Sequence, residues 1–355
     1  MALQLQFHPE AREGWPIVAE QYSTVDYHTG GEPFRIVSSL PVSIEGAGVP
    51  EKRVFAMQSP EIERIRQILC FEPRGHADMY GGFIVEPNDA GAHFGVLFWH
   101  KDGFSTACGH GTIALGVWAI ESGRVAIDPS GSTDVVIDVP SGRVTARVHT
   151  DGDSVTGVDF INVASYVLAE RVPVATSRGE VVVDVTFGGA IYAQLDAASV
   201  GLTVTPEDAA AVIAIGREIK WALNDSACAV HPSDERLSGI YGTIVYETLP
   251  PHPGGAVHQR NATIFADGEL DRSPCGSGTC ARLATLTANG TLAEDATLVH
   301  DSIVGSQFTA RVLERVEAEG HDAVMPQVTG MAFKTGEHVF TVDARDTLTP
   351  GFVLR

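Results

Sequence analysis

The chain has 355 residues, 44% hydrophobic and 19% charged, which suits a folded protein of two domains. It carries 24 Lys and Arg against 45 Asp and Glu, a formal net charge of −21. Such a surface repels nucleic acid and anionic membranes, so we expect neither as a partner, and local groups must hold any anionic substrate. No apolar run reaches the about 18 residues of a membrane span, and residues 1–15 lack the pattern of a secretory signal. Five sparse cysteines fit a reducing compartment, so we expect a cytoplasmic protein.

Strand-like and helix-like segments alternate along the chain after an N-terminal arm over residues 1–18. The expected strands are rich in Val, Ile, Phe and Thr and are bounded by Gly, Pro, Asp and Ser. In chain order they cover residues 17–19, 22–27, 34–37, 82–85, 93–99, 135–139, 144–148, 155–160, 181–185, 243–245 and 262–265. Helix caps, early prolines or acids and apolar spacing predict helices over residues 59–69, 112–122, 205–221 and 279–289.

One short motif occurs twice. Residues 108–114 read Cys-Gly-His-Gly-Thr-Ile-Ala and residues 275–281 read Cys-Gly-Ser-Gly-Thr-Cys-Ala, an offset of 275 − 108 = 167 residues. Each copy follows a strand-like run and opens a helix-like run. A fainter pair, residues 80–84 and 187–191, shares an aromatic-Gly-Gly sequence. The repeats predict a duplicated α+β unit folded into two pseudo-symmetric domains.

A cysteine at the start of such a motif lies where a helix begins. The first N–H groups of a helix are unpaired and its dipole is positive there, so the position attracts anions. This environment can lower the pKa of a thiol from about 8.5 into the ~3.5–7.5 range. If the halves face each other, Cys108 and Cys275 flank one cleft and two helix starts point at one carboxylate. That geometry suits removal of an α-proton from one face and delivery to the other.

Most lone cysteines beside glycines are packed small residues, but the repeat favours a functional role for the matched pair. Cys70, Cys228 and Cys280 are expected to be structural. His110 is expected to touch the substrate or to orient the thiolate, with a turn cap as the alternative. Asp271 is expected to accept the ammonium group of the substrate, again with a turn or cap role as the alternative.

With these residues in hand, the chain resembles the proline racemase family, which includes proline racemase, 4-hydroxyproline 2-epimerase and trans-3-hydroxyproline dehydratase. The resemblance implies a diaminopimelate-epimerase-like α/β (α+β) fold of two domains, each a sheet wrapped around a central helix, with the active site between them. We expect residues 18–157 and 340–355 in the first domain and residues 158–339 in the second. The matching motifs are DYHTGGEP (26–33), EPRGH (72–76), DMYG (78–81), CGHG (108–111), GGAIYA (188–193), DRSPCGSG (271–278), GSQF (305–308) and PGF (350–352).

The resemblance also implies roles for single residues. The two catalytic positions of the family fall on Cys108 and Cys275, and its ammonium-binding acid falls on Asp271. Phe265 is at a position that lines the ring pocket in family members. Family members use neither pyridoxal phosphate nor a metal. The carboxylate-binding amides fall on Gly109, His110, Gly276 and Ser277.

The second cysteine bears on the reaction. The motifs HTGGEP, GHADMYG and GGAIYA look most like the trans-3-hydroxyproline dehydratases, which typically carry Thr where this chain has Cys275. Inversion at Cα needs an acid on the second face, whereas dehydration needs only one base and loss of the 3-hydroxyl. We therefore expect a cofactor-independent racemase or epimerase of proline or 4-hydroxyproline. Dehydration of trans-3-hydroxy-L-proline is the alternative or a second activity. The apolar Phe265 accommodates proline and gives no sign of a hydroxyl partner.

Three other classes compete with this hypothesis. The first is a zinc-binding protein, but the four possible ligands Cys108, His110, Cys275 and Cys280 do not have the sequence spacing usual for zinc sites. A nucleotide site lacks both the Lys of a phosphate loop and a G-x-G-x-x-G sequence. A non-enzymatic imino-acid binding protein would keep the helix-start anion sites but would not need two tuned thiols. The expected partner is a small imino acid, and a homodimer is compatible with the sequence.

Overall fold

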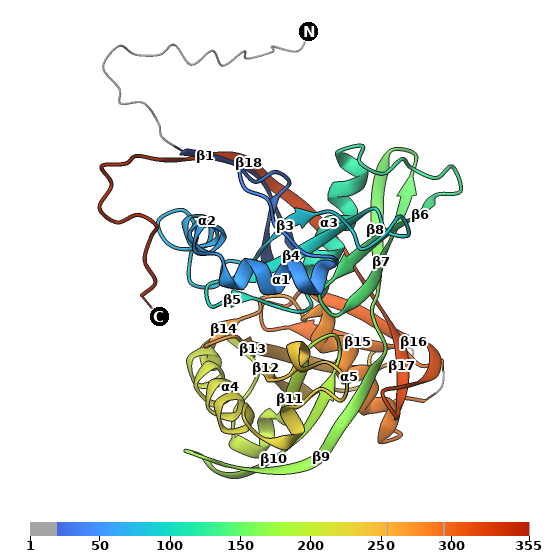
Figure 1. Cartoon of the computed structure of the whole chain (residues 1–355). Helices are drawn as coiled ribbons and strands as arrows, with labels where there is room; N and C mark the ends of the chain where they lie inside the picture. Colours follow the sequence, from blue (N-terminus) through green and yellow to red (C-terminus); the bar gives the residue numbers. More distant parts are fainter. Residues whose placement is uncertain (1–19, 254, 294, 355) are drawn as a thin grey trace, which may run out of the picture.

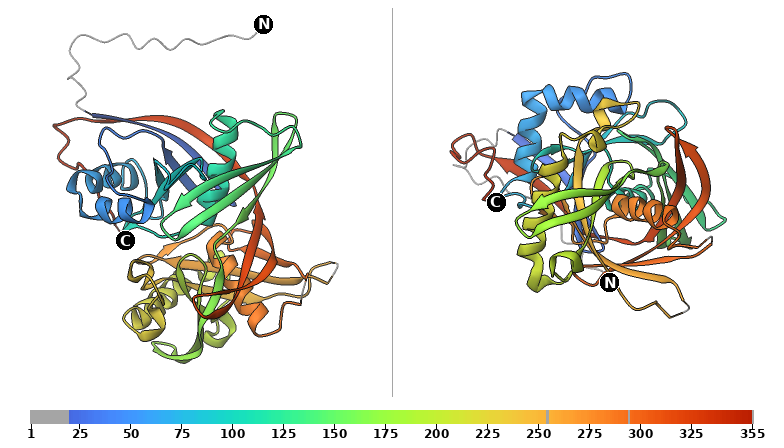
Figure 2. Two further views of the ribbon diagram at one scale, coloured as in Figure 1. Left: turned by 45° about the vertical axis from the view of Figure 1, so that its right-hand side comes forward. Right: turned by 90° about the horizontal axis from the view of Figure 1, so that it is seen from below.

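The computed structural model describes residues 20–253, 255–293 and 295–354. The predicted N-terminal arm over residues 1–18 and the strand over residues 17–19 lie outside the described residues. Figure 1 shows two lobes, one above the other, with the last long strand (red) returning to the upper lobe beside the first strand (blue). Figure 2 shows that the green and the red parts of the chain run between the two lobes.

Of the elements in the described residues, the first lobe contains three helices and the first eight strands. They are β1 (Glu20–Thr29), β2 (Glu32–Val37), α1 (Val49–Gln58), α2 (Pro60–Cys70), β3 (Gly81–Val85), β4 (Phe94–His100), β5 (Gly103–Phe104), α3 (Gly109–Glu121), β6 (Ser132–Val139), β7 (Gly142–Asp151) and β8 (Ser154–Ile161). The second lobe follows, and the chain then returns through its last strand. These elements are β9 (Ser165–Thr176), β10 (Gly179–Phe187), β11 (Ile191–Asp196), α4 (Ala209–Leu223), β12 (Ile240–Thr248), β13 (Val257–Phe265), β14 (Glu269–Leu270), α5 (Gly276–Ala288), β15 (Leu298–Ser302), β16 (Gln307–Ala318), β17 (His321–Gly330) and β18 (Ala332–Val342).

Strand pairing follows one pattern in both lobes. In the first lobe β1–β2 is antiparallel, β2–β3 parallel, β3–β4 antiparallel and β4–β6 parallel, followed by antiparallel β6–β7 and β7–β8. In the second lobe β10–β11 is antiparallel, β11–β12 parallel, β12–β13 antiparallel and β13–β15 parallel, followed by antiparallel β15–β16 and β16–β17. α3 and α5 enter this order at the same place, before β6 and before β15. The predicted pseudo-symmetric architecture is confirmed.

The fainter sequence repeat does not follow this symmetry. Residues 80–84 lead into β3, whereas residues 187–191 form the turn between β10 and β11. The pairing pattern instead relates that turn to the β1–β2 turn at residues 30–31, and relates β3 to β12. Tyr80, just before Gly81 of β3, therefore corresponds to Tyr241, just before Gly242 of β12. That part of the prediction was wrong because strand register, not a short run of glycines, decides which residues are equivalent.

A central helix fills each lobe. Every residue of α3 from Gly109 to Ile120 is buried, and so is every residue of α5 from Gly276 to Thr287. Each fully buried large apolar side chain contributes about 1.5–3 kcal/mol to stability. Both helices begin three residues earlier than predicted, directly after the motif cysteines. The predicted helix over residues 205–221 divides into a 3₁₀ turn (Pro206–Asp208) and α4.

The pairing of the last strand, β18, indicates where the second domain ends. β18 pairs with β1 along its length, from Val342 opposite Glu20 to Ala332 opposite Thr29. β8 pairs with β7 in the first lobe up to Ile161. We therefore propose that the second domain comprises residues 162–330, which moves both boundaries from the expected 158 and 339.

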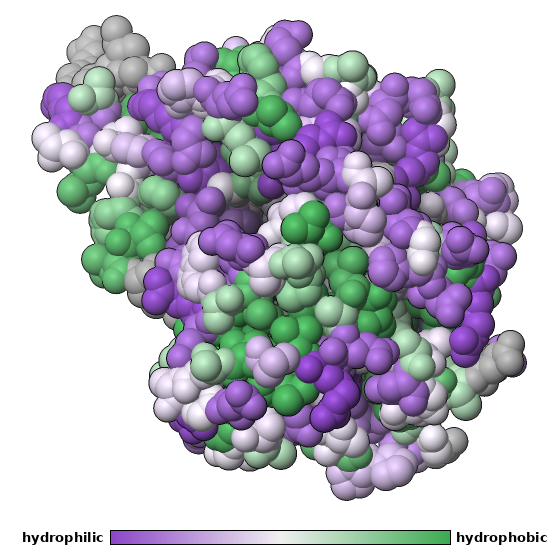
Figure 3. All heavy atoms as spheres, turned by 60° about the horizontal axis from the view of Figure 1, so that its bottom comes forward, coloured by the Kyte–Doolittle hydropathy of each residue, from purple (hydrophilic) through white to green (hydrophobic). Residues whose placement is uncertain are grey.

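Hydrophilic side chains cover much of the face seen in Figure 3, with hydrophobic residues gathered in the lower part of that view. Among the residues that the structure describes, no helix has the length and apolar character that a membrane span requires.

Candidate active site

The two motif cysteines cap the two central helices. The backbone N–H of Gly111 donates to Sγ of Cys108 at 3.2 Å, and the N–H of Gly278 donates to Sγ of Cys275 at 3.3 Å. Cys108 is 4% exposed and Cys275 is 5% exposed. The two thiols, 167 residues apart in the sequence and each at a helix N-terminus, line one cavity.

The motif glycines are required by close packing at this junction. A Cβ on Gly109 would lie 2.5 Å from Cα of Gly276, and a Cβ on Gly276 would lie 2.6 Å from Cα of Gly109. The two helix starts thus meet backbone to backbone, which only glycine allows. A Cβ on Gly111 would lie 2.7 Å from Sγ of Cys108. A Cβ on Gly278 would lie 2.8 Å from Sγ of Cys275.

The motif threonines tie each helix to the turn before it. The hydroxyl of Thr112 donates to the carbonyl oxygen of Cys108 at 2.7 Å. The hydroxyl of Thr279 donates to the carbonyl oxygen of Pro274 at 3.0 Å. Cys-Gly-x-Gly-Thr therefore describes one structural device: a capping thiol, two glycines that admit the neighbouring chain, and a threonine that fixes the turn.

Cys275 has an uncommon backbone conformation, with φ of 61° and ψ of 104°, whereas Cys108 has an ordinary extended φ of −156°. A non-glycine residue at positive φ outside a turn is strained and persists only where its surroundings hold it. The capping contact with Gly278 and the hydrogen bond from the Cys275 N–H to Oγ of Ser273, at 3.0 Å, hold it here. We infer that the strain aims this thiol at the pocket.

The pKa values of the two thiols are shifted in the direction opposite to the one expected. Burial raises the pKa of Cys108 and of Cys275 well above the ordinary value, and the charge of Asp271 raises both further. The capping N–H groups lower these pKa values but do not outweigh desolvation. The expectation of a depressed pKa was wrong for this enclosed pocket. A cation beside Asp271, such as a substrate ammonium, would remove part of the opposition to a thiolate.

Two buried carboxyl groups lie beside the thiols. The N–H and hydroxyl of Ser273 donate to Oδ1 of Asp271 at 2.8 and 2.7 Å, and burial raises the pKa of Asp271 to about 6. The N–H of Arg272 donates to Glu32 at 2.7 Å. Burial, and then the charge of Asp271, raise the pKa of Glu32 well above its usual range. Glu32 belongs to the family motif DYHTGGEP (26–33), but the sequence did not indicate that its side chain approaches this site.

His110 lies between the first thiol and Asp271. Each ring nitrogen is 3.5 Å from Sγ of Cys108, and Nδ1 is 3.9 Å from Oδ2 of Asp271. Burial lowers the pKa of His110 to about 3, so the ring is neutral. The ring also packs edge-on to Tyr80, with centroids 5.0 Å apart. We propose that His110, as a neutral ring, orients the thiol of Cys108.

The thiols face a small enclosed cavity of about 10 Å³. A water molecule needs about that much space, so a substrate can enter only if the surrounding groups move. The lining includes three tyrosines and a threonine that the sequence did not single out. The lining residues are Tyr80, Ala107, Cys108, His110, Tyr192, Tyr241, Thr263, Phe265, Asp271, Cys275 and Ser277.

Hydroxyl groups meet at the wall of this cavity. The hydroxyls of Tyr80 and Tyr241 are 2.9 Å apart, and that of Tyr80 also contacts Oγ of Ser105. The hydroxyl of Tyr192 lies 2.8 Å from Oγ of Ser277 at the start of α5. Phe265 closes the wall, its ring stacked on Tyr241 with centroids 5.8 Å apart. The aromatic pocket is therefore more polar than Phe265 alone suggested.

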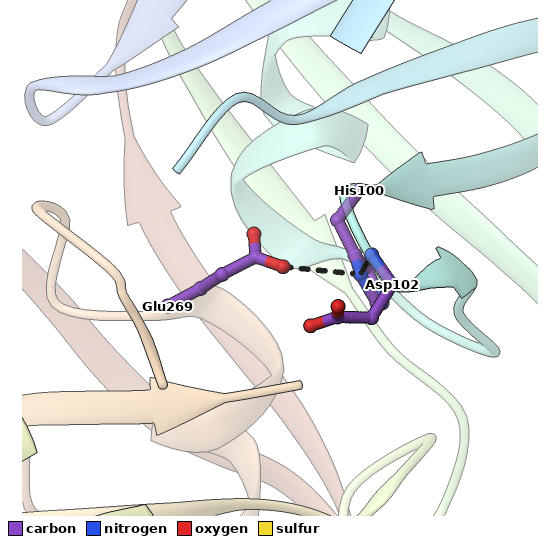
Figure 4. A group of neighbouring side chains, drawn as sticks. All are labelled: His100, Asp102 and Glu269. Atoms are coloured by element: carbon purple, nitrogen blue, oxygen red, sulfur yellow. Dashed lines mark hydrogen bonds and ion pairs between the residues drawn. The ribbon is translucent and has the colours of Figure 1, made fainter. Parts of the chain in front are cut away.

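A charged cluster joins the lobes behind this wall. Figure 4 shows His100 at the end of β4 and Asp102 just beyond it, facing Glu269 of β14, with Nδ1 of His100 3.3 Å from Oε1 of Glu269. Their ligand atoms lie within 4.8 Å of one another, the spacing of a metal site. Lys101 Nζ, however, lies 2.6 Å from Asp102 and 3.7 Å from Glu269, so an ammonium already supplies the positive charge. We assign this cluster a structural role between the lobes.

The four residues of the zinc hypothesis do not form such a group among the described residues. Cys280 is fully buried in the core with Leu283 and Leu286, as expected for a structural cysteine. Cys70 is also buried, and its thiol contacts the carbonyl oxygen of Met79 at 3.5 Å.

Known proteins are similar to this chain over nearly its whole length. The family model described as proline racemase matches residues 24–353. A trans-3-hydroxy-L-proline dehydratase of Bacillus cereus is 42% identical over 337 residues, covering 95% of this chain and 99% of the relative. A 3-hydroxyproline 2-epimerase of Burkholderia multivorans is also 42% identical, over 339 residues, with the same coverage.

A solved structure shares the fold. The hydroxyproline epimerase of Agrobacterium vitis, solved with bound trans-4-hydroxy-L-proline, is 29% identical. It superposes with a TM-score of 0.87 over 95% of this chain and 96% of that one. The diaminopimelate-epimerase-like fold is thereby confirmed. With the paired motif, the two capping thiols and these similarities together, the chain belongs to the proline racemase family and is an enzyme.

Proposed function

We propose that the protein is a two-thiol 2-epimerase that inverts Cα of a hydroxyproline. The observation that carries this proposal is the placement of two cysteine thiols, rather than one thiol and a threonine, at the starts of α3 and α5 in one pocket. The name of the Burkholderia relative makes 3-hydroxyproline the first substrate to test. 4-Hydroxyproline and proline, which the sequence suggested, are the next.

The reaction needs one thiolate and one thiol. The thiolate of one cysteine removes the Cα proton, and the thiol of the other donates a proton to the opposite face. Each turnover thus exchanges the protonation states of Cys108 and Cys275 and leaves their total proton count unchanged. Proton transfer of this kind contributes typically about 10²–10⁴-fold to the rate.

Charge on the substrate is met by the groups around the thiols. The N–H groups at the two helix starts, at Gly109, His110, Gly276 and Ser277, would bind the carboxylate and stabilise the negative charge that builds on it. Asp271, fully enclosed, would accept the ammonium group. These are the roles that the family resemblance implied. The mechanism proposed here does not require an electron-sink cofactor.

Hydroxyl groups favour a hydroxylated substrate over plain proline. Ser105, Tyr80 and Tyr241 form a chain of three hydroxyls joined by two hydrogen bonds, so one of the three hydroxyl hydrogens remains available to a further acceptor. Because burial raises the pKa of both tyrosines well above the ordinary value, these groups are neutral donors. A substrate hydroxyl at the pocket wall would accept this hydrogen.

Dehydration of trans-3-hydroxy-L-proline is the second candidate, favoured by the Bacillus relatives of that name. One thiolate would remove the Cα proton while the 3-hydroxyl leaves as water with a proton from the pocket. The enamine so formed would tautomerise to a cyclic imine. This reaction does not require a second thiol, so it does not explain why position 275 carries a cysteine rather than a threonine.

A parallel assay separates the candidates. The purified protein is incubated with L-proline, trans-4-hydroxy-L-proline and trans-3-hydroxy-L-proline, and the products are resolved by chiral chromatography. We expect the 2-epimer of a hydroxyproline. Formation of a cyclic imine from the 3-hydroxy compound, with no epimer of any substrate, would contradict the proposal in favour of the dehydratase.

We also propose that the protein works in a reducing, cytoplasmic setting. All five cysteines are free thiols in the structure, including the two that face one pocket. Oxidation of the pair would remove both the base and the acid, so activity should depend on a reductant.

A further inference from the structure

A second cleft lies beside the catalytic pocket, on the other side of Tyr241. It measures about 190 Å³, against about 10 Å³ for the pocket, and both lobes line it. Tyr241 lines both spaces. Ser105 and Thr106 line the cleft, whereas the next residues, Ala107 and Cys108, line the pocket. Tyr241 and the segment 105–108, which carries the first thiol, therefore separate the two spaces.

The charged residues of the cleft are all basic. Arg53 from α1, Lys220 from α4 and Arg236 before β12 line it, and no Asp or Glu does. The chain as a whole carries nearly twice as many acids as bases, 45 against 24. The lining of this cleft is therefore basic, although the chain as a whole is acidic.

Two of these cations lack an acidic partner. The Arg53 guanidinium donates to the carbonyl oxygen of Phe104 at 2.6 and 3.0 Å, and Nζ of Lys220 donates to that of Ile240 at 2.7 Å. No carboxylate of the described residues forms an ion pair with either side chain, whereas Arg236 pairs with Glu51 at 2.6 Å and with Asp234 at 2.8 Å. Burial lowers the pKa of Arg53 and of Lys220, and it outweighs the opposite effects of Asp234 on Arg53 and of Asp267 and Asp102 on Lys220.

We propose that this cleft is an access site for small carboxylates, where Arg53 and Lys220 hold the carboxylate of the incoming imino acid before it passes Tyr241 into the catalytic pocket. The identity of this ligand rests on the proposed function. A free imino acid carries an ammonium as well as a carboxylate and has no net charge, so the cleft acts on it only at close range. There the cations favour entry with the carboxylate in front, and salt screens this attraction. Carbonyl-bound cations keep unused donors, so they can bind a carboxylate without first breaking an ion pair.

The site predicts a change in association rate rather than in final affinity. Exchange broadening in NMR spectra of a ¹³C-carboxylate-labelled hydroxyproline gives the association and dissociation rate constants for the full-length protein. In a variant that combines Arg53→Gln and Lys220→Met, we expect association to slow about threefold at low ionic strength and to lose its dependence on salt, since only the carboxylate end of the zwitterion is attracted. The dissociation constant should stay within about twofold, because the carboxylate leaves these residues when it reaches the pocket.

Matched variants separate charge from packing. Arg53→Lys keeps the charge and should restore most of the rate and its salt dependence. Arg345→Gln removes a cation from an exposed pair with Asp343, outside the cleft, and should change neither. Equal slowing in Arg53→Lys and Arg53→Gln, or a weakened dissociation constant with unchanged association, would contradict the proposal.

Crystals soaked in sodium bromide give a test that does not use the imino acid. Anomalous scattering should locate bromide beside Arg53 and Lys220, and a cleft without bromide would overturn the anion site. If bromide binds there but no hydroxyproline binds the protein, the proposed function fails while the anion site stands. If hydroxyproline turns over but its association ignores salt, the proposed function stands and the access site fails.

Discussion

Gly109 and Gly276 meet backbone to backbone where α3 and α5 begin, so close that a Cβ on Gly109 would lie 2.5 Å from Cα of Gly276. The two glycines hold the same place in the two copies of the repeated motif, directly after the capping cysteines. Their contact brings the free N–H groups of two helices to one point. The proposed carboxylate site is therefore made by the contact between the lobes rather than by either lobe alone.

Gly109→Ala and Gly276→Ala should each separate the helix starts. We expect a loss of about 1–3 kcal/mol in stability, as for overpacked cores, and at least a hundredfold loss of kcat/KM because the thiols and amides shift together. Gly157→Ala is the matched control, since nothing lies within 4 Å of a Cβ there. Thermal unfolding and epimerisation rates measure both effects. Full activity in either variant would show that the helix contact does not set the site.

Cys275→Thr tests the second thiol. Threonine can cap the helix through its hydroxyl but is too weak an acid to deliver a proton to Cα. We expect epimerisation to fall by about 10²–10⁴-fold, while exchange of the Cα proton with solvent continues on the face of Cys108. Cys228→Ser, at a half-buried thiol outside the pocket, is the control. Undiminished epimerisation in Cys275→Thr would contradict the two-thiol account.

Asp271→Asn tests the ammonium site and its pH dependence. Burial raises the pKa of Asp271 from 3.8 to about 6, so substrate binding should strengthen as pH rises through about 6, where the carboxylate forms. In the variant this limb of the pH profile of kcat/KM should disappear and KM should rise. Asp267→Asn, at an exposed pair with Arg217, should keep the limb. A limb near pH 6 that persists in Asp271→Asn would assign it to another group.

The same pKa shift predicts an effect on stability. A group whose pKa is raised on folding contributes stability at pH values below its unfolded pKa, and that contribution is lost as pH rises through the folded value. At neutral pH the enclosed Asp271 carboxylate therefore destabilises the fold. Asp271→Asn should be more stable there by on the order of 1 kcal/mol, while binding substrate less well. Thermal unfolding at pH 5 and pH 8 measures this; a gain of equal size at both pH values would contradict it.

Much of the site could be predicted because its signals are local. Helix-start chemistry, glycine spacing and the exact repeat of one motif placed Cys108 and Cys275 at two helix starts, and the structure brings them together. The pKa direction could not be predicted in the same way. It depends on how completely the second lobe excludes water from the first, which no local pattern reports.

The missed elements have a similar explanation. α1 buries Val49, Lys52 and Ala56, so it lacks a clear apolar stripe. β18 is stabilised by pairing with β1 from the other end of the chain, and many of its side chains are exposed. Tyr80 and Tyr241 were not singled out because the fainter repeat aligned Tyr80 with Phe187. Only the strand register shows that the two tyrosines are partners.

The tyrosine pair should set the preference for a hydroxylated ring. Tyr241→Phe and Tyr80→Phe each remove one hydroxyl from the chain that ends at Ser105. We expect the ratio of kcat/KM for hydroxyproline over proline to fall about tenfold or more, since a lost hydrogen bond to a neutral group costs about 0.5–1.5 kcal/mol and an unpaired one costs more. Tyr166→Phe removes a buried hydroxyl that bonds His231 at 3.0 Å, away from the pocket, and serves as control. An unchanged ratio in both pocket variants would assign the preference elsewhere.

The central claim is that the two thiols act on opposite faces of Cα, and the position of deuterium early in the reaction tests it most directly. Hydroxyproline is incubated with the wild-type protein in D₂O, and mass spectrometry of the separated epimers is read while conversion is still small. The account predicts deuterium in the product epimer and protium in the recovered substrate, because the donating thiol carries solvent deuterium while the accepting thiolate holds the abstracted proton. Protium retained in the product, or deuterium appearing in substrate and product at the same rate, would mean that a single base serves both faces and would contradict the account.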